Sequence, residues 1–200
     1  MESLDTIFNK HNTDKNTSFH NYTRQYNTLL KDFRDKPIKY LEIGVFNGGS
    51  IKAVRESFLN SNCILGLDID NRCKTYEDIN NNIFIEIGDA TDANFIKTIT
   101  KKYGSFDIIL DGSHTNRDVI KSFELLFPLL NDNGLYIVED TICYKSPSYI
   151  LPNYANHLQY FFKYTQFLNQ WRYDSSEGIK DNCIDPFKIQ KKPIMYLNIQ

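Results

Sequence analysis

Two acidic segments near the middle of the chain contain residue types that bind metal ions and move protons. Asp111 and His114 belong to the sequence Asp-Gly-Ser-His, and Glu139 and Asp140 directly follow the apolar segment 135–138. Carboxylate oxygens are the ligands that Mg²⁺ prefers. Histidine, with an ordinary pKa of about 6.5, can accept a proton near neutral pH. The predicted metal ligands are Asp111, Glu139 and Asp140, and the predicted catalytic residues are His114 and Asp111.

A structural role is the alternative for the same residues. Asp111 could cap the helix that follows it, and His114 could be a hydrogen-bonded histidine in a loop. The occurrence of three acids and a histidine directly after two apolar segments favours the chemical interpretation.

A glycine-containing turn follows the first apolar segment, 38–43. Residues 42–50 read Glu-Ile-Gly-Val-Phe-Asn-Gly-Gly-Ser, which differs from the G-x-G-x-x-G of dinucleotide-binding turns. The glycines could serve only the geometry of a tight turn, but they also let the backbone approach a ligand. An acid in the turn fits a positively charged ligand such as S-adenosylmethionine. The residues predicted to contact this cofactor are Glu42, Gly44, Gly48, Gly49 and Ser50.

Further polar residues follow the next two apolar segments. Asp68 comes at the end of the second segment, where a carboxylate can accept hydrogen bonds from both hydroxyls of a ribose. Without the glycine turn, Asp68 would be interpreted as a solvated acid at the end of a strand. Asp89 and Ala90 follow the third segment, where they could contact the edge of an adenine.

The elements that position these residues alternate along the chain. Strand-length segments that are apolar on both faces, separated by segments long enough for helices, predict a parallel sheet covered on both sides. The fold class is therefore α/β, with a doubly wound, mostly parallel sheet. The predicted strands are 38–43, 63–69, 83–87, 106–110 and 135–138, and the predicted helices are 50–59, 72–80, 92–103 and 115–130.

We expect the 200 residues to form a single domain with three parts. Residues 1–37 form an N-terminal cap with short helices near 2–9 and 18–34, 38–142 form the cofactor-binding core, and 143–200 form a C-terminal helix and tail. Near the end of the chain, 194–199 is the candidate for one more strand. In the tail, helical spacing predicts a helix packed on the core through Tyr154, Leu158, Phe161, Thr165 and Leu168.

The composition is that of an ordinary globular protein. Hydrophobic residues make up 41%, charged residues 24%, and the net charge is −2, which argues against disorder and against general nucleic-acid binding. No apolar run approaches the ~18 residues of a membrane span, and the chain start lacks the pattern of a signal peptide. The four cysteines include no C-x-x-C pair. We expect a cytoplasmic protein that binds neither nucleic acid nor membranes and could form homo-oligomers.

Motifs in order along residues 11–142 resemble those of the class I S-adenosylmethionine-dependent methyltransferases. More narrowly, they are similar to the metal-dependent O-methyltransferases that act on sugars of macrolides and surface glycans, the mycinamicin and macrocin type, some of which are labelled cephalosporin hydroxylase-like. The motifs are Thr13-Asp14-Lys15, His20 with Tyr22, and residues 41–50, 65–70, 88–92, 106–114 and 134–141.

The resemblance implies roles for residues and a Rossmann-like methyltransferase fold. It implies Mg²⁺ binding by Asp111, Glu139 and Asp140, and a general base at His114. It also implies that Asp14, Lys15 and Tyr22 cover the cofactor or the substrate, and we count Tyr22 among the cofactor-binding residues. The family fold ends in an antiparallel pair of strands, which 194–199 alone would leave incomplete.

The expected function is methyl transfer, assisted by Mg²⁺, from S-adenosylmethionine to a hydroxyl of a sugar or of a glycan or natural-product precursor. One alternative is a module that binds S-adenosylmethionine with little or no catalysis. A second is a nicotinamide-dependent oxidoreductase, which is disfavoured because the chain lacks a pyrophosphate-binding turn. The sequence does not identify the methyl acceptor.

Overall fold

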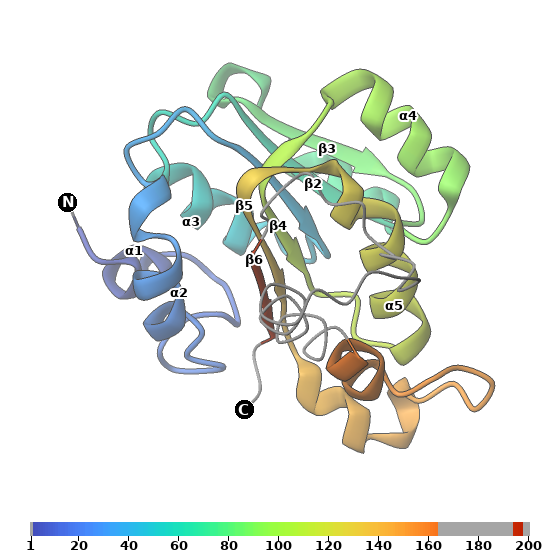
Figure 1. The fold of residues 1–200 in the computed structure, drawn as a ribbon. Helices are drawn as coiled ribbons and strands as arrows, with labels where there is room; N and C mark the ends of the chain where they lie inside the picture. The colour runs from blue at the N-terminus through green and yellow to red at the C-terminus, as the bar shows by residue number, and fades with distance from the viewer. Residues whose placement is uncertain (1, 164–193, 198–200) are drawn as a thin grey trace, which may run out of the picture.

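A twisted parallel sheet forms the centre of the molecule (Figure 1). The structure is a computed structural model, and it describes residues 2–163 and 194–197. The strand order is β3-β2-β1-β4-β5-β6, and each neighbouring pair is parallel. The strands are β1 (Lys39–Ile43), β2 (Cys63–Asp68), β3 (Ile83–Ile87), β4 (Phe106–Asp111), β5 (Leu130–Val138) and β6 (Ile194–Leu197).

The order of the strands creates a switch point between β1 and β4. The chain builds β1, β2 and β3 outward in one direction, then returns to place β4 and β5 on the other side of β1. Ligands of open α/β sheets bind outside the carboxyl ends of the strands at such a point. The predicted doubly wound α/β fold is confirmed.

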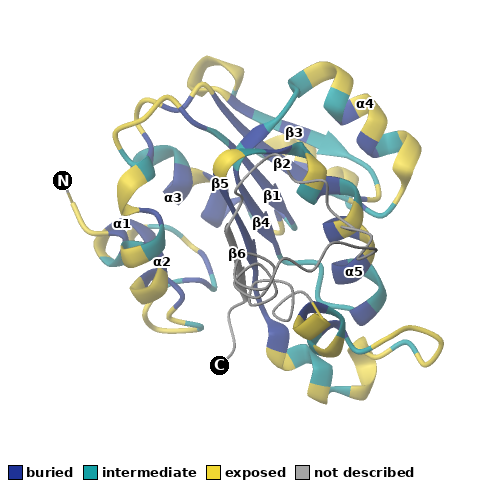
Figure 2. Ribbon diagram, in the orientation of Figure 1, coloured by how far each residue is buried: buried dark blue, intermediate teal, exposed yellow. Residues whose placement is uncertain are grey.

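Helices cover both faces of the sheet (Figure 1). One face packs against α1 (Leu4–Lys10), α2 (Thr23–Leu29) and α3 (Gly49–Ser57), and the other packs against α4 (Ala93–Tyr103) and α5 (Asn116–Leu126). Successive residues of a strand point to opposite faces, so Tyr40 belongs to the core under α3 and Leu41 to the core under α5. The strands are buried on both faces (Figure 2).

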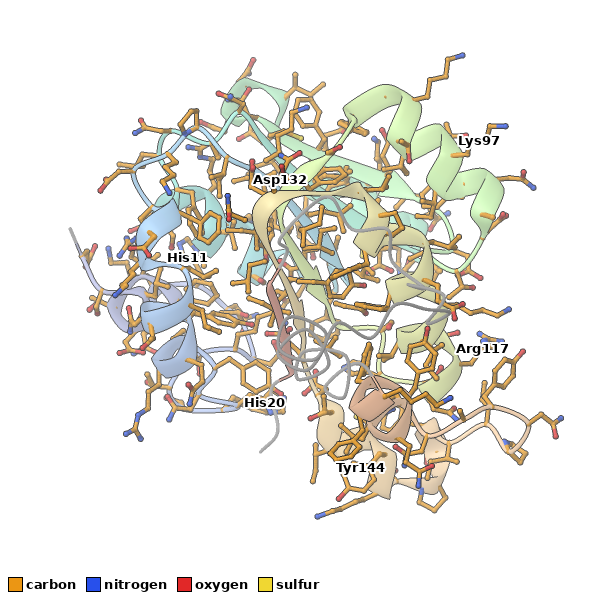
Figure 3. All side chains as sticks on the ribbon, viewed as in Figure 1. His11, His20, Lys97, Arg117, Asp132 and Tyr144 are labelled. Carbon is orange, nitrogen blue, oxygen red and sulfur yellow. The ribbon has the colours of Figure 1, made fainter. Side chains whose placement is uncertain are left out.

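The helices that cover the sheet are amphipathic. In α4, Ile96 and Ile99 are buried against the sheet, while Lys97 projects into solvent (Figure 3). Side chains of Asp92 and Thr115 cap the first turns of α4 and α5 by accepting backbone N–H hydrogen bonds. Local sequence and burial therefore agree in this part of the chain.

Two connections differ from the sequence prediction. The helix predicted at 72–80 is replaced by two 3₁₀ helices, Asn71–Tyr76 and Ile79–Asn81, in a segment rich in asparagine and other poor helix formers. The helix predicted at 115–130 ends earlier, and β5 begins at Leu130 rather than at 135. The pairing of β4 with β5 shifts register between Phe106 and Ile108, which accommodates the longer strand.

The C-terminal part agrees with the sequence in some respects. Residues 157–163 are helical, and Phe161 is buried with its ring 4.9 Å from that of Phe123. Tyr154 precedes this helix and is exposed, whereas Thr165 and Leu168 lie outside the described residues. The expected strand near 194 is present as β6, but it runs parallel to β5 and not antiparallel. None of the described helices has the length and hydropathy needed to span a bilayer.

Candidate active site

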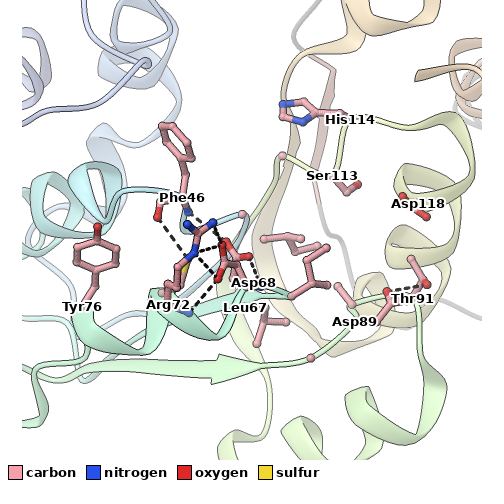
Figure 4. A pocket seen from close by; sticks show the side chains of 18 of the residues that line it. Phe46, Leu67, Asp68, Arg72, Tyr76, Asp89, Thr91, Ser113, His114 and Asp118 are labelled. Carbon is pink, nitrogen blue, oxygen red and sulfur yellow. Dashed lines mark hydrogen bonds and ion pairs between the residues drawn. The ribbon is translucent and has the colours of Figure 1, made fainter. Parts of the chain in front are cut away.

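Two adjoining pockets open at the carboxyl ends of the strands. The large pocket, of about 550 Å³, lies over the ends of β2 and β3 and includes Asp68 and Asp89 in its lining (Figure 4). The small pocket, of about 280 Å³, lies between residues 13–15 and the end of β1. The residues that line both pockets are Gly44, Phe46, Asn47, Gly112 and His114.

The glycine turn between β1 and α3 is shaped by close backbone contacts. Gly44 has a φ of +92°, a conformation that other residues rarely adopt. A Cβ atom on Gly49 would lie 1.8 Å from the carbonyl oxygen of Asn12. The N-terminal segment therefore crosses directly over the start of α3 at Asn12, and residues 13–15 form one wall of the small pocket.

Asp68 holds this turn in place. Its Oδ2 atom accepts hydrogen bonds from the backbone N–H groups of Val45 at 2.8 Å and Phe46 at 3.1 Å, and its Oδ1 atom accepts one from Asp70 at 2.9 Å. A carboxylate has about four acceptor positions. At least three of these positions are occupied, and the predicted contact of Asp68 with both hydroxyls of a ribose stays a prediction.

Asp89 and Ala90 lie where the sequence placed them, in the lining of the large pocket. The Oδ1 atom of Asp89 accepts hydrogen bonds from the backbone N–H and the hydroxyl of Thr91. These bonds fix the turn after β3, and the predicted contact of Asp89 and Ala90 with an adenine stays a prediction.

Glu42 provides a buried carboxylate at the small pocket. Its Oε2 atom accepts hydrogen bonds from the hydroxyls of Tyr40 at 3.0 Å and Ser50 at 2.9 Å. Its Oε1 atom has no hydrogen-bond donor among the described residues. Burial raises the pKa of Glu42, although Lys15 opposes this effect. The free oxygen fits a positively charged group in the pocket.

Lys15 is a buried cation among carboxylates. Its Nζ atom lies 2.7 Å from Oε2 of Glu139, 3.7 Å from Oδ1 of Asp14 and 4.0 Å from Oε1 of Glu42. Burial alone would lower the pKa of Lys15, but attraction to Glu139 and Glu42 prevails and raises it. Burial raises the pKa of Glu139, opposed by Lys15. The ion pair joins the N-terminal segment to the end of β5.

Asp140 connects His114 with the N-terminal segment. Its Oδ2 atom lies 2.9 Å from Nε2 of His114, and its Oδ1 atom accepts a hydrogen bond from the hydroxyl of Tyr22. Burial would raise the pKa of Asp140, but the hydrogen bonds from His114 and Tyr22 prevail and lower it to about 2. Asp140 is therefore ionised at neutral pH and can orient the imidazole.

Asp111 faces away from this cluster. It pairs in register with Val138, so its side chain lies on the α5 face, whereas the next residue of the other strand, Glu139, lies on the α3 face. The side-chain atoms that donate to its two oxygens are the hydroxyls of Ser113, Ser122 and Tyr136, and the backbone N–H of Ser113 also donates. Burial raises the pKa of Asp111.

Across residues 2–163 and 194–197, no group of three or more histidine, cysteine, aspartate or glutamate side chains is arranged to hold a metal ion. The metal-binding role predicted for Asp111 together with Glu139 and Asp140 stays a prediction. The carboxylates of Glu42 and Glu139, each with an Oε1 atom that lacks a donor within the described chain, are the ones whose charge fits a cation.

Residues 25–159 match the protein family described as Rhamnosyl O-methyltransferase/CmcI. The chain belongs to this family. It is 37% identical over 145 residues to mycinamicin VI 2''-O-methyltransferase of Micromonospora griseorubida, covering 68% of this chain and 35% of the relative. It is 32% identical over 145 residues to demethylmacrocin O-methyltransferase of Streptomyces fradiae, covering 68% and 36%.

A solved structure supports the same assignment. MycE methyltransferase of the mycinamycin biosynthetic pathway, in complex with Mg and SAH, superposes with a TM-score of 0.77 and 27% identity, covering 94% of this chain and 48% of that one. The chain thus spans less than half the length of these relatives. The resemblance to sugar O-methyltransferases found in the motifs is confirmed.

The family motifs reach the site in different ways. Glu42, Gly44, Ser50, Asp140 and His114 line the small pocket. Five other predicted site residues line neither pocket: Gly48, Gly49, Tyr22, Asp111 and Glu139. Cys73, Tyr76 and Asp118 also line the large pocket, and no motif pointed to them because they lie in the 3₁₀ helix after β2 and in the first turn of α5.

Proposed function

We propose that this chain transfers the methyl group of S-adenosylmethionine to a hydroxyl of a sugar-containing acceptor. The observation that carries the proposal is the Asp140–His114 pair, at the junction of a 550 Å³ pocket and a 280 Å³ pocket. The named relatives are O-methyltransferases of mycinamicin VI and demethylmacrocin, and the chain shares their family.

The two pockets fit the two ends of the cofactor. The large pocket offers Asp68 for a ribose hydroxyl and the wall near Ala90 for the adenine. The small pocket offers the donor-free Oε1 atom of Glu42 for the ammonium of the methionine part. The sulfur that joins the two parts would then lie at the junction, beside His114.

In this proposal His114 takes the proton of the acceptor hydroxyl. With hydrogen on Nε2, its neutral ring donates to Asp140 and keeps a lone pair on Nδ1. Because Asp140 is ionised, it stabilises the imidazolium that forms when the proton arrives. Tyr22 holds Asp140 from the other side, and it is a positioning residue.

The buried carboxylates at the end of β5 also fit Mg²⁺. Glu139 and Asp140 would hold the ion, since Glu139 keeps a buried oxygen without a donor in the described part of the chain. A bound Mg²⁺ supplies Lewis acidity that lowers the pKa of a hydroxyl and orients it. Asp111 could join these ligands only if its present donors release it.

The test is a comparison of His114→Ala with His11→Ala. His11 is a matched control because its Nε2 atom also lies 2.9 Å from a carboxylate, that of Glu56, and it lies at the end of α1 (Figure 3). Transfer of a labelled methyl group to a panel of rhamnosides and macrolide glycosides reports turnover, and calorimetric titration with S-adenosylhomocysteine reports binding.

We expect His114→Ala to abolish turnover and to leave S-adenosylhomocysteine binding close to that of the unmodified protein, with His11→Ala unchanged in both. Full activity of His114→Ala would place the base elsewhere. An unmodified protein that binds neither S-adenosylmethionine nor S-adenosylhomocysteine would refute the proposed function itself.

A further inference from the structure

Phe46 has a backbone conformation and an exposure that the fold alone does not explain. Its φ is +52°, in the left-handed region that phenylalanine rarely adopts, and it is 75% exposed. Its backbone is fixed from two sides, since its N–H donates to Asp68 and its carbonyl oxygen accepts a hydrogen bond from Sγ of Cys73 at 3.3 Å. The backbone at Phe46 is therefore fixed by hydrogen bonds, and its exposed ring contributes little to the hydrophobic core.

A glycine or asparagine would adopt the same conformation at a lower energetic cost. An exposed aromatic ring on a fixed and unfavourable backbone conformation points to a contact between the ring and a bound ligand. In Figure 4 the ring of Phe46 projects from the turn away from Asp68, and His114 lies across the pocket from it.

The location of Phe46 identifies the part of the ligand that it meets. It lines both pockets, and among the residues that do so it is the one with an aromatic hydrocarbon ring. If the adenosyl part occupies the large pocket and the methionine part the small one, the sulfonium lies at the junction of the two pockets. A positively charged group over an aromatic face is attracted by the ring quadrupole.

We propose that the ring of Phe46 binds the sulfonium of S-adenosylmethionine and makes the site prefer this cation over neutral S-adenosylhomocysteine. The inference rests on the proposed function. After methyl transfer the sulfur is neutral and this attraction is lost, so the same contact favours release of the product.

The experiment is calorimetric titration with three probes: S-adenosylmethionine, S-adenosylhomocysteine, and sinefungin, which carries an ammonium near the position of the methyl group. Phe46→Leu keeps an apolar side chain and removes the ring, and Phe46→Tyr keeps the ring. We expect Phe46→Leu to weaken S-adenosylmethionine and sinefungin binding about 2- to 30-fold. S-adenosylhomocysteine binding should change much less, and Phe46→Tyr should retain the preference.

Two further variants separate this effect from a loss of structure. Phe46→Gly removes the ring and accepts the positive φ, so it should fold with an unchanged or higher melting temperature and show the same selective loss. Leu59→Ala, equally exposed at 75% but beyond the far end of α3, should leave all three affinities unchanged.

Equal weakening of the charged and neutral ligands by Phe46→Leu would show a plain apolar contact and overturn the inference, as would no change at all. These outcomes leave the proposed function intact, because the unmodified protein binds both ligands in either case. Absence of binding to the unmodified protein would overturn both.

Discussion

Replacement of Lys15 by methionine tests how the N-terminal segment is attached to the sheet. The substitution keeps a long, flexible side chain and removes the ammonium that lies 2.7 Å from Glu139. Lys15 is 7% exposed and Glu139 is 1% exposed, so water cannot readily replace the lost partner. Glu139 would then be a buried carboxylate without a counter-charge.

The expected cost follows from this burial. Removing one partner of a buried ion pair costs about 3–5 kcal/mol. Glu42, at 4.0 Å, loses a partner as well, whereas the side chain of Asp14 is 42% exposed and loses little. We expect about 4 kcal/mol of lost stability, which lowers the melting temperature by about 8–16 °C for a domain of this size.

The stability lost in Lys15→Met should depend on pH. Without Lys15 the pKa of buried Glu139 rises further, so the folded variant takes up a proton that the unfolded chain binds only in more acidic solution. A raised pKa contributes stability at low pH that is lost as the pH rises through the folded-state value. The destabilisation relative to the unmodified protein should therefore shrink as the pH falls toward about 7, the folded-state pKa of Glu139 beside Lys15.

The assay is urea unfolding followed by circular dichroism, for Lys15→Met, Glu139→Gln and the double variant. The double variant should recover more than half of the loss, since no unpaired charge remains at Glu139. Lys10→Met is the matched control: Lys10 also has carboxylate oxygens at 2.7 Å, but its side chain is exposed, so its loss should have little effect. A Lys15→Met variant as stable as Lys10→Met, or a double variant no better than Lys15→Met, would refute the reasoning.

Three other substitutions have defined outcomes. Gly49→Ala places a Cβ 1.8 Å from the carbonyl oxygen of Asn12, so it should displace that segment and weaken S-adenosylhomocysteine binding in a calorimetric titration. Tyr136→Phe removes one donor to buried Asp111 and should cost about 1–3 kcal/mol in urea unfolding. Burial lowers the pKa of His157 below its usual 6.5, so the unfolded chain binds a proton more readily and the protein loses stability as the pH falls through that value. His157→Gln should show a smaller fall in melting temperature over the same pH range, and an identical fall would exclude this histidine as the cause.

The sequence was sufficient to predict the sheet because each strand carries its own signal. Apolar segments such as 106–110 are bounded by glycine and acidic residues, so their positions could be predicted without knowledge of tertiary contacts. The start of β5 could not, since Asn131, Asp132 and Asn133 resemble a loop and lie in the register shift between the Phe106–Leu130 and Ile108–Leu135 pairs. Segment 71–81 likewise has helical length but turns instead.

The sequence placed the acids at the correct edge and could not say which face each would occupy. In a strand buried on both sides, apolar residues occupy both faces and no alternation reveals the direction of a side chain. Asp111 and Glu139 thus appear equivalent in the sequence, although one meets Tyr136 and Ser122 and the other meets Lys15. The contact of Tyr22 with Asp140 spans 118 positions and has no local signal.

The distribution of buried charge argues that this edge serves a ligand as well as the fold. Replacing buried ion pairs with apolar residues is often neutral or stabilising, so Glu42, Glu139 and Asp140 are not there for stability alone. Lys15 compensates part of their charge, and oxygens of Glu42 and Glu139 remain without donors in the described residues. Perturbed, incompletely compensated carboxylates concentrate at functional sites. A cationic ligand at the junction of the two pockets would supply the missing positive charge. It would lie near Lys15 and Tyr22, which attach the N-terminal segment to the end of β5.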